Sequence, residues 1–251
     1  RIISRKEKLG IQKPNSIQNE SFFDIIDTEA KAYFLGFMYA DGCISTPKLG
    51  QKRITIGLNH YYKNILETFR KYLVMKNELI FCELSKKKMR FNSQDKYILS
   101  ANSDKLSNSL TALGCGTRKT FTLKFPTLEQ VPAHLIRHFI MGLMDGDGCI
   151  GYYPTVKNIH QRCRLILTNI NLDFLTKIKD YFASYNIPSY IALKHSKNSQ
   201  YYHWSYGPRP AYLTKVVLDM LYKDSTFEIC LKRKYNKYLE ICNAAKELEH
   251  I

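Results

Sequence analysis

The stretch FLGFMYADG, residues 34–42, returns in altered form as IMGLMDGDG, residues 140–148. Each copy is an apolar run that ends in an aspartate followed by a glycine, with Asp41 in the first copy and Asp147 in the second. Because apolar residues occur almost all around each run, both runs are expected to form buried helices. A motif that occurs twice in one chain predicts an internal duplication.

Each of these helices has a recognisable start signal. Thr28 is a suitable N-cap for the first helix, and Glu29 follows it in the first turn. Pro132 is expected to be the first residue of the second helix, since proline is favoured at that position.

The same order of elements follows each copy of the motif. Alternation and helical spacing predict two strands, an amphipathic helix, two more strands and a closing helix. In the first copy these are expected at 43–47, 53–59, 61–73, 79–85, 96–102 and 103–113. In the second copy they are expected at 149–154, 164–169, 171–185, 190–195, 201–207 and 211–222. The chain is therefore expected to be an α+β protein of two αββαββα repeats related by a pseudo-twofold axis.

Three segments are expected along the 251 residues: a basic arm at 1–24, the first repeat at 25–126, and the second repeat with a C-terminal helix at 127–251. The arm begins RIISRKEKLGIQKPN, which fits either a solvated basic tail or the end of a helix-turn-helix. Because its first residue is Arg and not Met, we expect a fragment or a processed product.

The composition favours a polyanionic partner. Lys and Arg total 38 against 22 acidic residues, a formal net charge of +16, and nucleic acid is the first candidate for such a field. The longest apolar run, 32–40, is far shorter than the ~20 residues of a membrane span. No signal peptide is evident, and the seven cysteines are scattered as reduced thiols would be. We expect an intracellular location (cytoplasm, nucleoid or organelle matrix), without secretion or membrane insertion.

The predicted strands have one apolar and one basic face. Ile54, Ile56 and Leu58 alternate with polar neighbours, and the second copy repeats the pattern. A basic β-ribbon fits the major groove of DNA, where Arg and Lys contact phosphates and base edges. The candidate DNA-contacting residues lie on the strands and at the hairpin tips: Arg53, Thr55, Lys86, Lys88, Arg90, Arg162, Arg164, Lys194, His195 and Lys197.

Small residues predict how the two apolar helices meet. Gly36 and Ala40 are four residues apart, as are Gly142 and Gly146, so each pair lies on one helix face. Small residues at this spacing let two helix backbones approach closely. If the helices cross along these faces, their C-terminal ends lie side by side.

That crossing would bring Asp41 and Asp147 together, which is electrostatically unfavourable. The C-terminus of a helix carries partial negative charge, and two neighbouring carboxylates repel each other. A divalent cation relieves both problems, and hard oxygen donors suit Mg²⁺. Metal held by paired acids can activate water for phosphodiester cleavage. An Asp-Gly turn explains one such aspartate, but its recurrence at equivalent places favours the catalytic interpretation.

The two stretches resemble the paired motifs of LAGLIDADG homing endonucleases, and the resemblance covers roughly residues 25–240. It implies a single-chain, monomeric, intron-encoded enzyme with two saddle-shaped antiparallel sheets on double-stranded DNA. It further implies that Asp41 and Asp147 bind divalent metal, Mg²⁺ or another ion, with the carbonyls of Ala40 and Gly146, and direct hydrolysis of both strands to staggered ends. Tyr39 departs from the earlier aspartate of the motif, while Asp145 retains it; the resemblance does not make that position a metal ligand.

Members of this family also place a basic residue near each acid, late in each repeat. The resemblance implies Lys119 in the first repeat, with Lys124 as the alternative. In the second repeat it implies one of Lys232, Arg233 or Lys234, and Lys234 is the working choice.

The same sequence features also bear on three alternative functions. An RNA-binding intron maturase, or a non-cleaving regulator of the same fold, would have the same basic surface, and intron RNA is a possible second partner. A glycoside hydrolase also uses paired acids, but abundant lysines and a single Trp argue against a sugar platform. A calcium loop at DGDG is excluded because Cys149 stands where an acidic ligand is needed.

Overall fold

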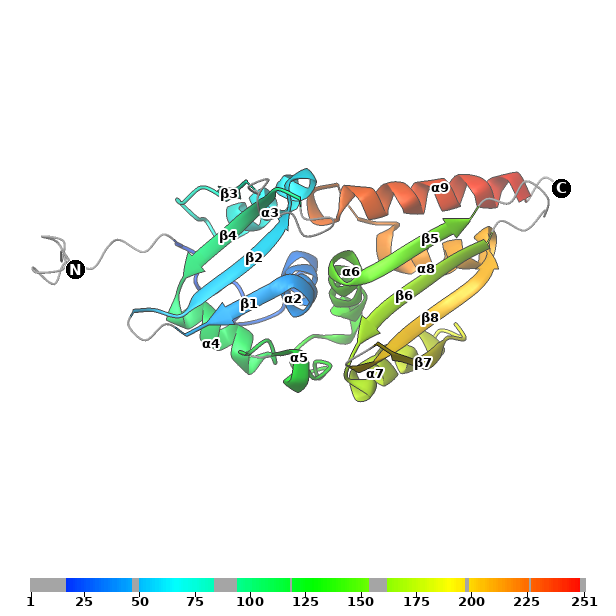
Figure 1. The fold of residues 1–251 in the computed structure, drawn as a ribbon, viewed down its shortest axis with the longest axis horizontal. Helices are drawn as coiled ribbons and strands as arrows, with labels where there is room; N and C mark the ends of the chain where they lie inside the picture. The colour runs from blue at the N-terminus through cyan, green and yellow to red at the C-terminus, as the bar shows by residue number, and fades with distance from the viewer. Residues whose placement is uncertain are drawn as a thin grey trace, which may run out of the picture.

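The computed structural model describes residues 17–46, 50–83, 94–117, 119–153, 162–196, 199–225 and 227–248. Two four-stranded antiparallel sheets lie on either side of a central pair of helices, α2 and α6 (Figure 1). Within the described ranges, no helix has the length and apolar character needed to cross a membrane.

Each repeat has the expected αββαββα order. The first repeat contains α2 (Glu29–Asp41), β1 (Gly42–Ser45), β2 (Arg53–Asn59), the 3-10 turn η1 (His60–Tyr62), α3 (Lys63–Tyr72), β3 (Ile80–Cys82), β4 (Lys96–Asn102) and α4 (Asp104–Ala112). A linker with the short helix α5 (Lys119–Thr122) connects the repeats. The second repeat contains η3 (Ala133–Leu135), α6 (Ile136–Gly146), β5 (Gly148–Tyr153), β6 (Arg162–Asn169), α7 (Leu172–Ala183), β7 (Tyr190–His195), β8 (Gln200–Pro210), α8 (Ala211–Tyr222), η4 (Phe227–Ile229) and α9 (Lys232–Leu248).

The two sheets have the same topology, β1-β2-β4-β3 in the first and β5-β6-β8-β7 in the second. Their central strands have one buried and one open face, as the alternation predicts. The buried positions are Ile54, Ile56 and Leu58 in β2, and Cys163, Leu165 and Leu167 in β6. The open face begins with Arg53 in β2 and Arg162 in β6, both exposed. Helices therefore cover one face of each sheet and leave the basic face free.

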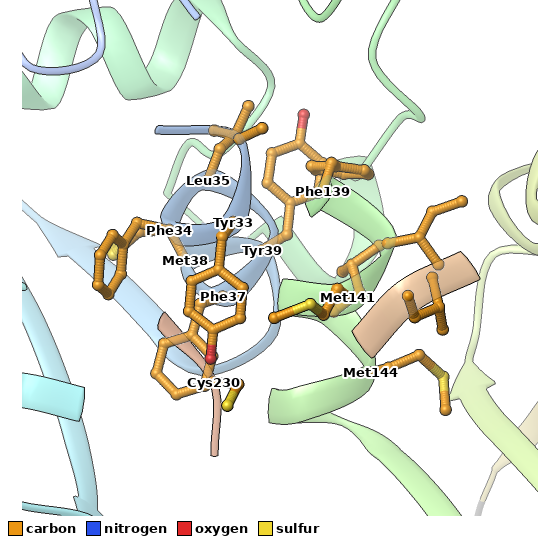
Figure 2. Close-up of a cluster of buried hydrophobic side chains, with 14 of the residues drawn as sticks. Tyr33, Phe34, Leu35, Phe37, Met38, Tyr39, Phe139, Met141, Met144 and Cys230 are labelled. Carbon is orange, nitrogen blue, oxygen red and sulfur yellow. The ribbon is translucent and has the colours of Figure 1, made fainter. Parts of the chain in front are cut away.

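Helices α2 and α6 cross in direct backbone contact at glycine. A Cβ atom on Gly36 would lie within 3.0 Å of the Phe139 backbone, and one on Gly142 would lie within 3.0 Å of the Tyr33 backbone. A Cβ on Gly146 would overlap Ala40. Figure 2 shows the aromatic and methionine side chains of both helices packed around this crossing. The expected close approach through small residues is confirmed.

Of the two residues predicted to begin the central helices, Thr28 does so and Pro132 does not. The Thr28 side chain accepts a hydrogen bond from the Lys31 backbone N–H at 3.3 Å, so the expected N-cap is confirmed. Pro132 is not the first residue of α6: its ψ of 146° is extended, and it precedes the η3 turn. The Leu135 N–H bonds to the Pro132 carbonyl at 2.8 Å, so one tight turn comes before the α-helix.

Part of the predicted N-terminal arm is in fact core. The sequence predicts an arm over 1–24, but Ile17 forms a β-bridge with Met75. Phe22 and Phe23 are buried, and each lies 6.0 Å from the Phe69 ring of α3, centroid to centroid. Burial of these three apolar side chains outweighs the basic character of the surrounding segment. Residues 1–16, which carry the possible helix-turn-helix remnant, lie outside the described ranges.

Candidate active site

The crossing places two exposed aspartates at the C-terminal ends of the central helices. Asp41 is the last residue of α2, and Asp147 is the C-cap residue of α6. A Cβ on Gly146 would lie 3.3 Å from Asp41 Oδ2, so the Asp41 carboxylate lies against the last turn of the other helix. Strands β1 and β5 begin immediately after these aspartates, so both carboxylates lie where the open faces of the two sheets meet.

The electrostatics of the two aspartates reflect this crowding. Although both side chains reach solvent, the surrounding helix ends remove part of their water, and this desolvation raises the pKa of each. The neighbouring Asp147 raises the pKa of Asp41 further. Lys119 and Lys234 act in the opposite direction and lower the pKa of both carboxyls. The site thus holds two neighbouring acids and two cations that favour their ionised form.

Lys119 lies at the end of α2. Its ammonium donates hydrogen bonds to the carbonyls of Met38 at 2.7 Å and Ala40 at 2.8 Å, and also to that of Tyr39. No basic residue of α2 itself lies in its last turn, so Lys119 supplies the positive charge that this end of the helix lacks. Desolvation lowers the pKa of Lys119, and the nearby Cys115 thiol and the two aspartates offset part of that effect.

Lys234 makes the equivalent contacts at the end of α6. Its ammonium donates to the carbonyls of Met144 and Asp145, the latter at 2.7 Å, and the residue is only 3% exposed. Burial lowers its pKa to about 8, with Asp145 acting in the opposite direction. The alternatives weighed from the sequence, Lys124, Lys232 and Arg233, are all exposed. Lys119 and Lys234 are therefore the two lysines that the fold places at the helix ends.

Asp145 has a role that sequence reasoning did not assign. It is 1% exposed and accepts hydrogen bonds from the hydroxyls of Tyr33 and Tyr222, each at 2.7 Å, and from the Leu231 N–H at 2.6 Å. Burial raises its pKa, while Lys234 and these donors lower it. At the equivalent position of the first repeat, the Tyr39 hydroxyl donates to the Leu113 carbonyl. No sequence pattern connects Asp145 with partners so distant along the chain.

The predicted DNA-contacting residues within the described ranges lie on or at the ends of the strands. On the first sheet, Arg53 donates to Asn102 Oδ1 at 3.0 Å, and Thr55 is half-buried on the same face. On the second, Arg164 donates to the Tyr190 hydroxyl at 3.1 Å, which orients its guanidinium across the sheet. Arg162 and His195 are exposed, and Lys194 is half-buried. Lys86, Lys88, Arg90 and Lys197 lie outside the described ranges.

His203 was not anticipated and belongs to the same face of the second sheet. It pairs with Ala192 and Thr168 in the neighbouring strands. Desolvation lowers its pKa, and the nearby charges of Lys194 and Arg164 lower it further. A neutral imidazole can both donate and accept a hydrogen bond, so this residue adds a polar contact to the basic surface.

The donor set at the helix ends fits a hard divalent cation. It offers the carboxylates of Asp41 and Asp147 with the carbonyls of Ala40 and Gly146, all oxygen donors of the kind that Mg²⁺ prefers. The Ala40 carbonyl already accepts a hydrogen bond from Lys119, so an ion would use its second lone pair. Partial burial raises the pKa of both carboxyls, and a bound cation would offset that cost by stabilising their ionised forms. No cluster of three or more His, Cys, Asp or Glu side chains occurs among the described residues, so further ligands would be water or phosphate oxygens.

Comparison with known proteins gives one family and several solved structures. Residues 134–244, most of the second repeat, match a family described as the LAGLIDADG-like domain. No curated protein matches the chain.

The solved structures resemble the chain over nearly its whole length. The meganuclease I-SmaMI, bound to uncleavable DNA, is similar at 10% identity and a TM-score of 0.54, covering 95% of this chain and 92% of its own. The homing endonuclease I-WcaI, bound to its DNA recognition sequence, is similar at 13% identity and a TM-score of 0.55, covering 93% and 98%. The LAGLIDADG homing endonuclease I-LtrWI, bound to target DNA, is similar at 10% identity and a TM-score of 0.55, covering 92% of each chain. At these identities the likeness establishes the fold.

Proposed function

We propose that this chain is a LAGLIDADG homing endonuclease: a site-specific DNA endonuclease that cuts both strands of a long duplex target with staggered ends. The observation that carries the proposal is the paired site. Two aspartates end two crossing helices, and each helix end binds a lysine from outside the helix through its last carbonyls. Each repeat thus has one aspartate and one lysine at its helix end, and double-strand cleavage needs two such sets of groups, one for the hydrolysis of each strand.

The open sheets supply the binding surface for the duplex. Both flank the paired site, and their exposed faces carry Arg53, Arg162 and Arg164. A net charge of +16 favours a polyanion, and antiparallel strands fit the major groove. The relatives I-WcaI and I-LtrWI are bound to DNA in their structures, which supports the same partner here. Because both halves of the site come from one chain, a monomer suffices.

The Asp41 and Asp147 carboxylates, with the carbonyls of Ala40 and Gly146, would hold Mg²⁺ or a similar ion. When bound, such an ion lowers the pKa of a water molecule and neutralises charge on the phosphate. The positive charges of Lys119 and Lys234 favour the ionised form of both carboxyls and offset part of the rise in their pKa that desolvation causes. The same charges stabilise the negative charge that develops on the phosphate during attack. The buried helix crossing holds these groups in fixed positions before DNA arrives.

Cleavage of a randomised duplex library tests this proposal. With Mg²⁺, we expect ends that share one long recognition sequence and carry a fixed stagger. EDTA should abolish cleavage, and Mg²⁺ added in excess of EDTA should restore it, because the paired carboxylates need a cation. Cutting that persists in EDTA, or binding of duplex with no cutting under any divalent ion, would contradict the proposal.

A further inference from the structure

The two lysines at the helix ends are supported in different ways. Lys119 is half-buried and belongs to α5, a helix of 4 residues in the linker between the repeats. Lys234 is buried and belongs to α9, a helix of 17 residues that packs against α8 and β5. Figure 1 shows α9 running along one edge of the second repeat, with its first turn near the central helices. The position of Lys234 therefore depends on how the start of α9 is held.

Asp145 holds the start of α9 through a closed ring of hydrogen bonds. The Leu231 N–H donates to Asp145 Oδ2 at 2.6 Å. The Leu231 carbonyl in turn accepts the Lys234 N–H at 2.8 Å, as the first backbone bond of α9. The Lys234 ammonium then returns to the Asp145 carbonyl at 2.7 Å. A carboxylate is also well placed beside the positive end of the α9 dipole. The Asp145 side chain thus holds the backbone at the start of α9 through Leu231, and the Asp145 carbonyl holds the Lys234 ammonium.

The first repeat lacks this ring. Tyr39 replaces the aspartate, and its neutral hydroxyl donates to the Leu113 carbonyl, which precedes α5 in the linker. Lys119 reaches the α2 carbonyls from α5 without a carboxylate at the equivalent position. The two halves of the site therefore differ at the residue two positions before each aspartate, which is Tyr39 in the first repeat and Asp145 in the second.

We propose that Asp145 is a positioning residue for one half of the site only: it anchors the start of α9 and so holds the Lys234 ammonium at the C-terminal end of α6. The inference rests on the proposed function and deepens it. Loss of this anchor should impair cutting of the strand that the second half serves and spare the other strand. A residue that merely stabilised the shared core would affect both strands equally.

The anchor is first tested without DNA, by competitive acetylation of the free protein and mass spectrometry of each lysine. In the wild type, buried Lys234 should react far more slowly than exposed Lys232 on the same helix. Asp145→Ala and Leu231→Pro break the same hydrogen bond from its two ends. Each should raise the reactivity of Lys234 relative to Lys232 by about tenfold through local opening of the first turn.

Tyr222→Phe is the matched control. It removes one hydrogen bond to Asp145 but leaves the bond to Leu231. Lys234 should then stay protected. The inference is overturned if Tyr222→Phe raises the acetylation of Lys234 as much as Asp145→Ala does. It is also overturned if Lys234 stays protected from acetylation in a folded Asp145→Ala or Leu231→Pro variant. If Asp145→Ala does not fold, Leu231→Pro decides, because it retains the buried carboxylate and its two tyrosine donors.

Strand-resolved cleavage of a duplex that the wild type cuts is the second readout. Lys119→Met and Lys234→Met identify the strand that depends on each half. Asp145→Ala should slow the Lys234-dependent strand by about tenfold or more and leave the other within about twofold, so that nicked duplex accumulates. Equal slowing of both strands, or slowing of the Lys119-dependent strand, contradicts the inference. A wild type that cuts no duplex refutes the proposed function instead, and the acetylation result still decides the anchor.

Discussion

We expect Asp41→Asn and Asp147→Asn each to abolish double-strand cleavage, with a loss of about a thousandfold in rate, and to leave duplex affinity within about threefold. The amide keeps the shape of the side chain but removes the charge that would bind the cation. The fold should not depend on either negative charge, since both side chains are exposed at the ends of the two helices. Strand-resolved cleavage assays and equilibrium binding of the same duplex measure the two quantities.

The matched control for these variants is Asp180→Asn. Asp180 is exposed on α7, which packs on the covered face of the second sheet, so the charge change is identical but remote from the paired acids. Cleavage by Asp180→Asn should equal that of the wild type. If Asp41→Asn or Asp147→Asn cut both strands at the wild-type rate, the assignment of the site would be wrong.

Gly142→Leu has the largest expected effect on stability, a loss of about 3 kcal/mol or more in the free energy of unfolding, or failure to fold. Even a Cβ atom at this position would lie within 3.0 Å of the Tyr33 carbonyl and the Phe37 N–H group of the other helix. A leucine side chain must therefore push the two backbones apart. This opens the core around the crossing, where aromatic and methionine side chains from both helices interleave (Figure 2). Chemical denaturation gives the change directly.

Gly57→Leu provides the comparison for this substitution. A Cβ on Gly57 would meet only Ile98 Cγ1, at 3.6 Å, on the open face of the first sheet. Its stability should therefore stay within about 1 kcal/mol of the wild type. An unchanged melting temperature in Gly142→Leu would show that the helices do not meet through this glycine.

Local patterns in the sequence were sufficient to predict the repeat, the sheets and the crossing. Strand alternation assigns Ile54 and Leu165 to buried faces, because successive side chains point to opposite sides of a strand. The four-residue spacing of Gly142 and Gly146 predicts the helix contact, because residues at that spacing lie on one helix face. These features need only residues that are close together along the chain.

Features that depend on distant residues could not be predicted in this way. Phe22 and Phe23 lie in a segment with a basic start, and only their contact with Phe69 shows that they belong to the core. Asp145 collects donors from three other parts of the chain, so its network becomes visible only after folding. Lys234 differs from its two basic neighbours by the side of α9 on which it lies, and that depends on where the helix begins.

The central claim is that two crossing helices deliver the carboxylates of Asp41 and Asp147 to one cation-binding centre over the duplex. Crystals of the protein with its selected duplex and Mn²⁺, measured at the manganese absorption edge, test this most directly. The account predicts that the anomalous peaks form one cluster at the helix ends, with both carboxylates among the ligands. Manganese bound elsewhere, or a cluster in which either aspartate has no metal contact, would contradict it.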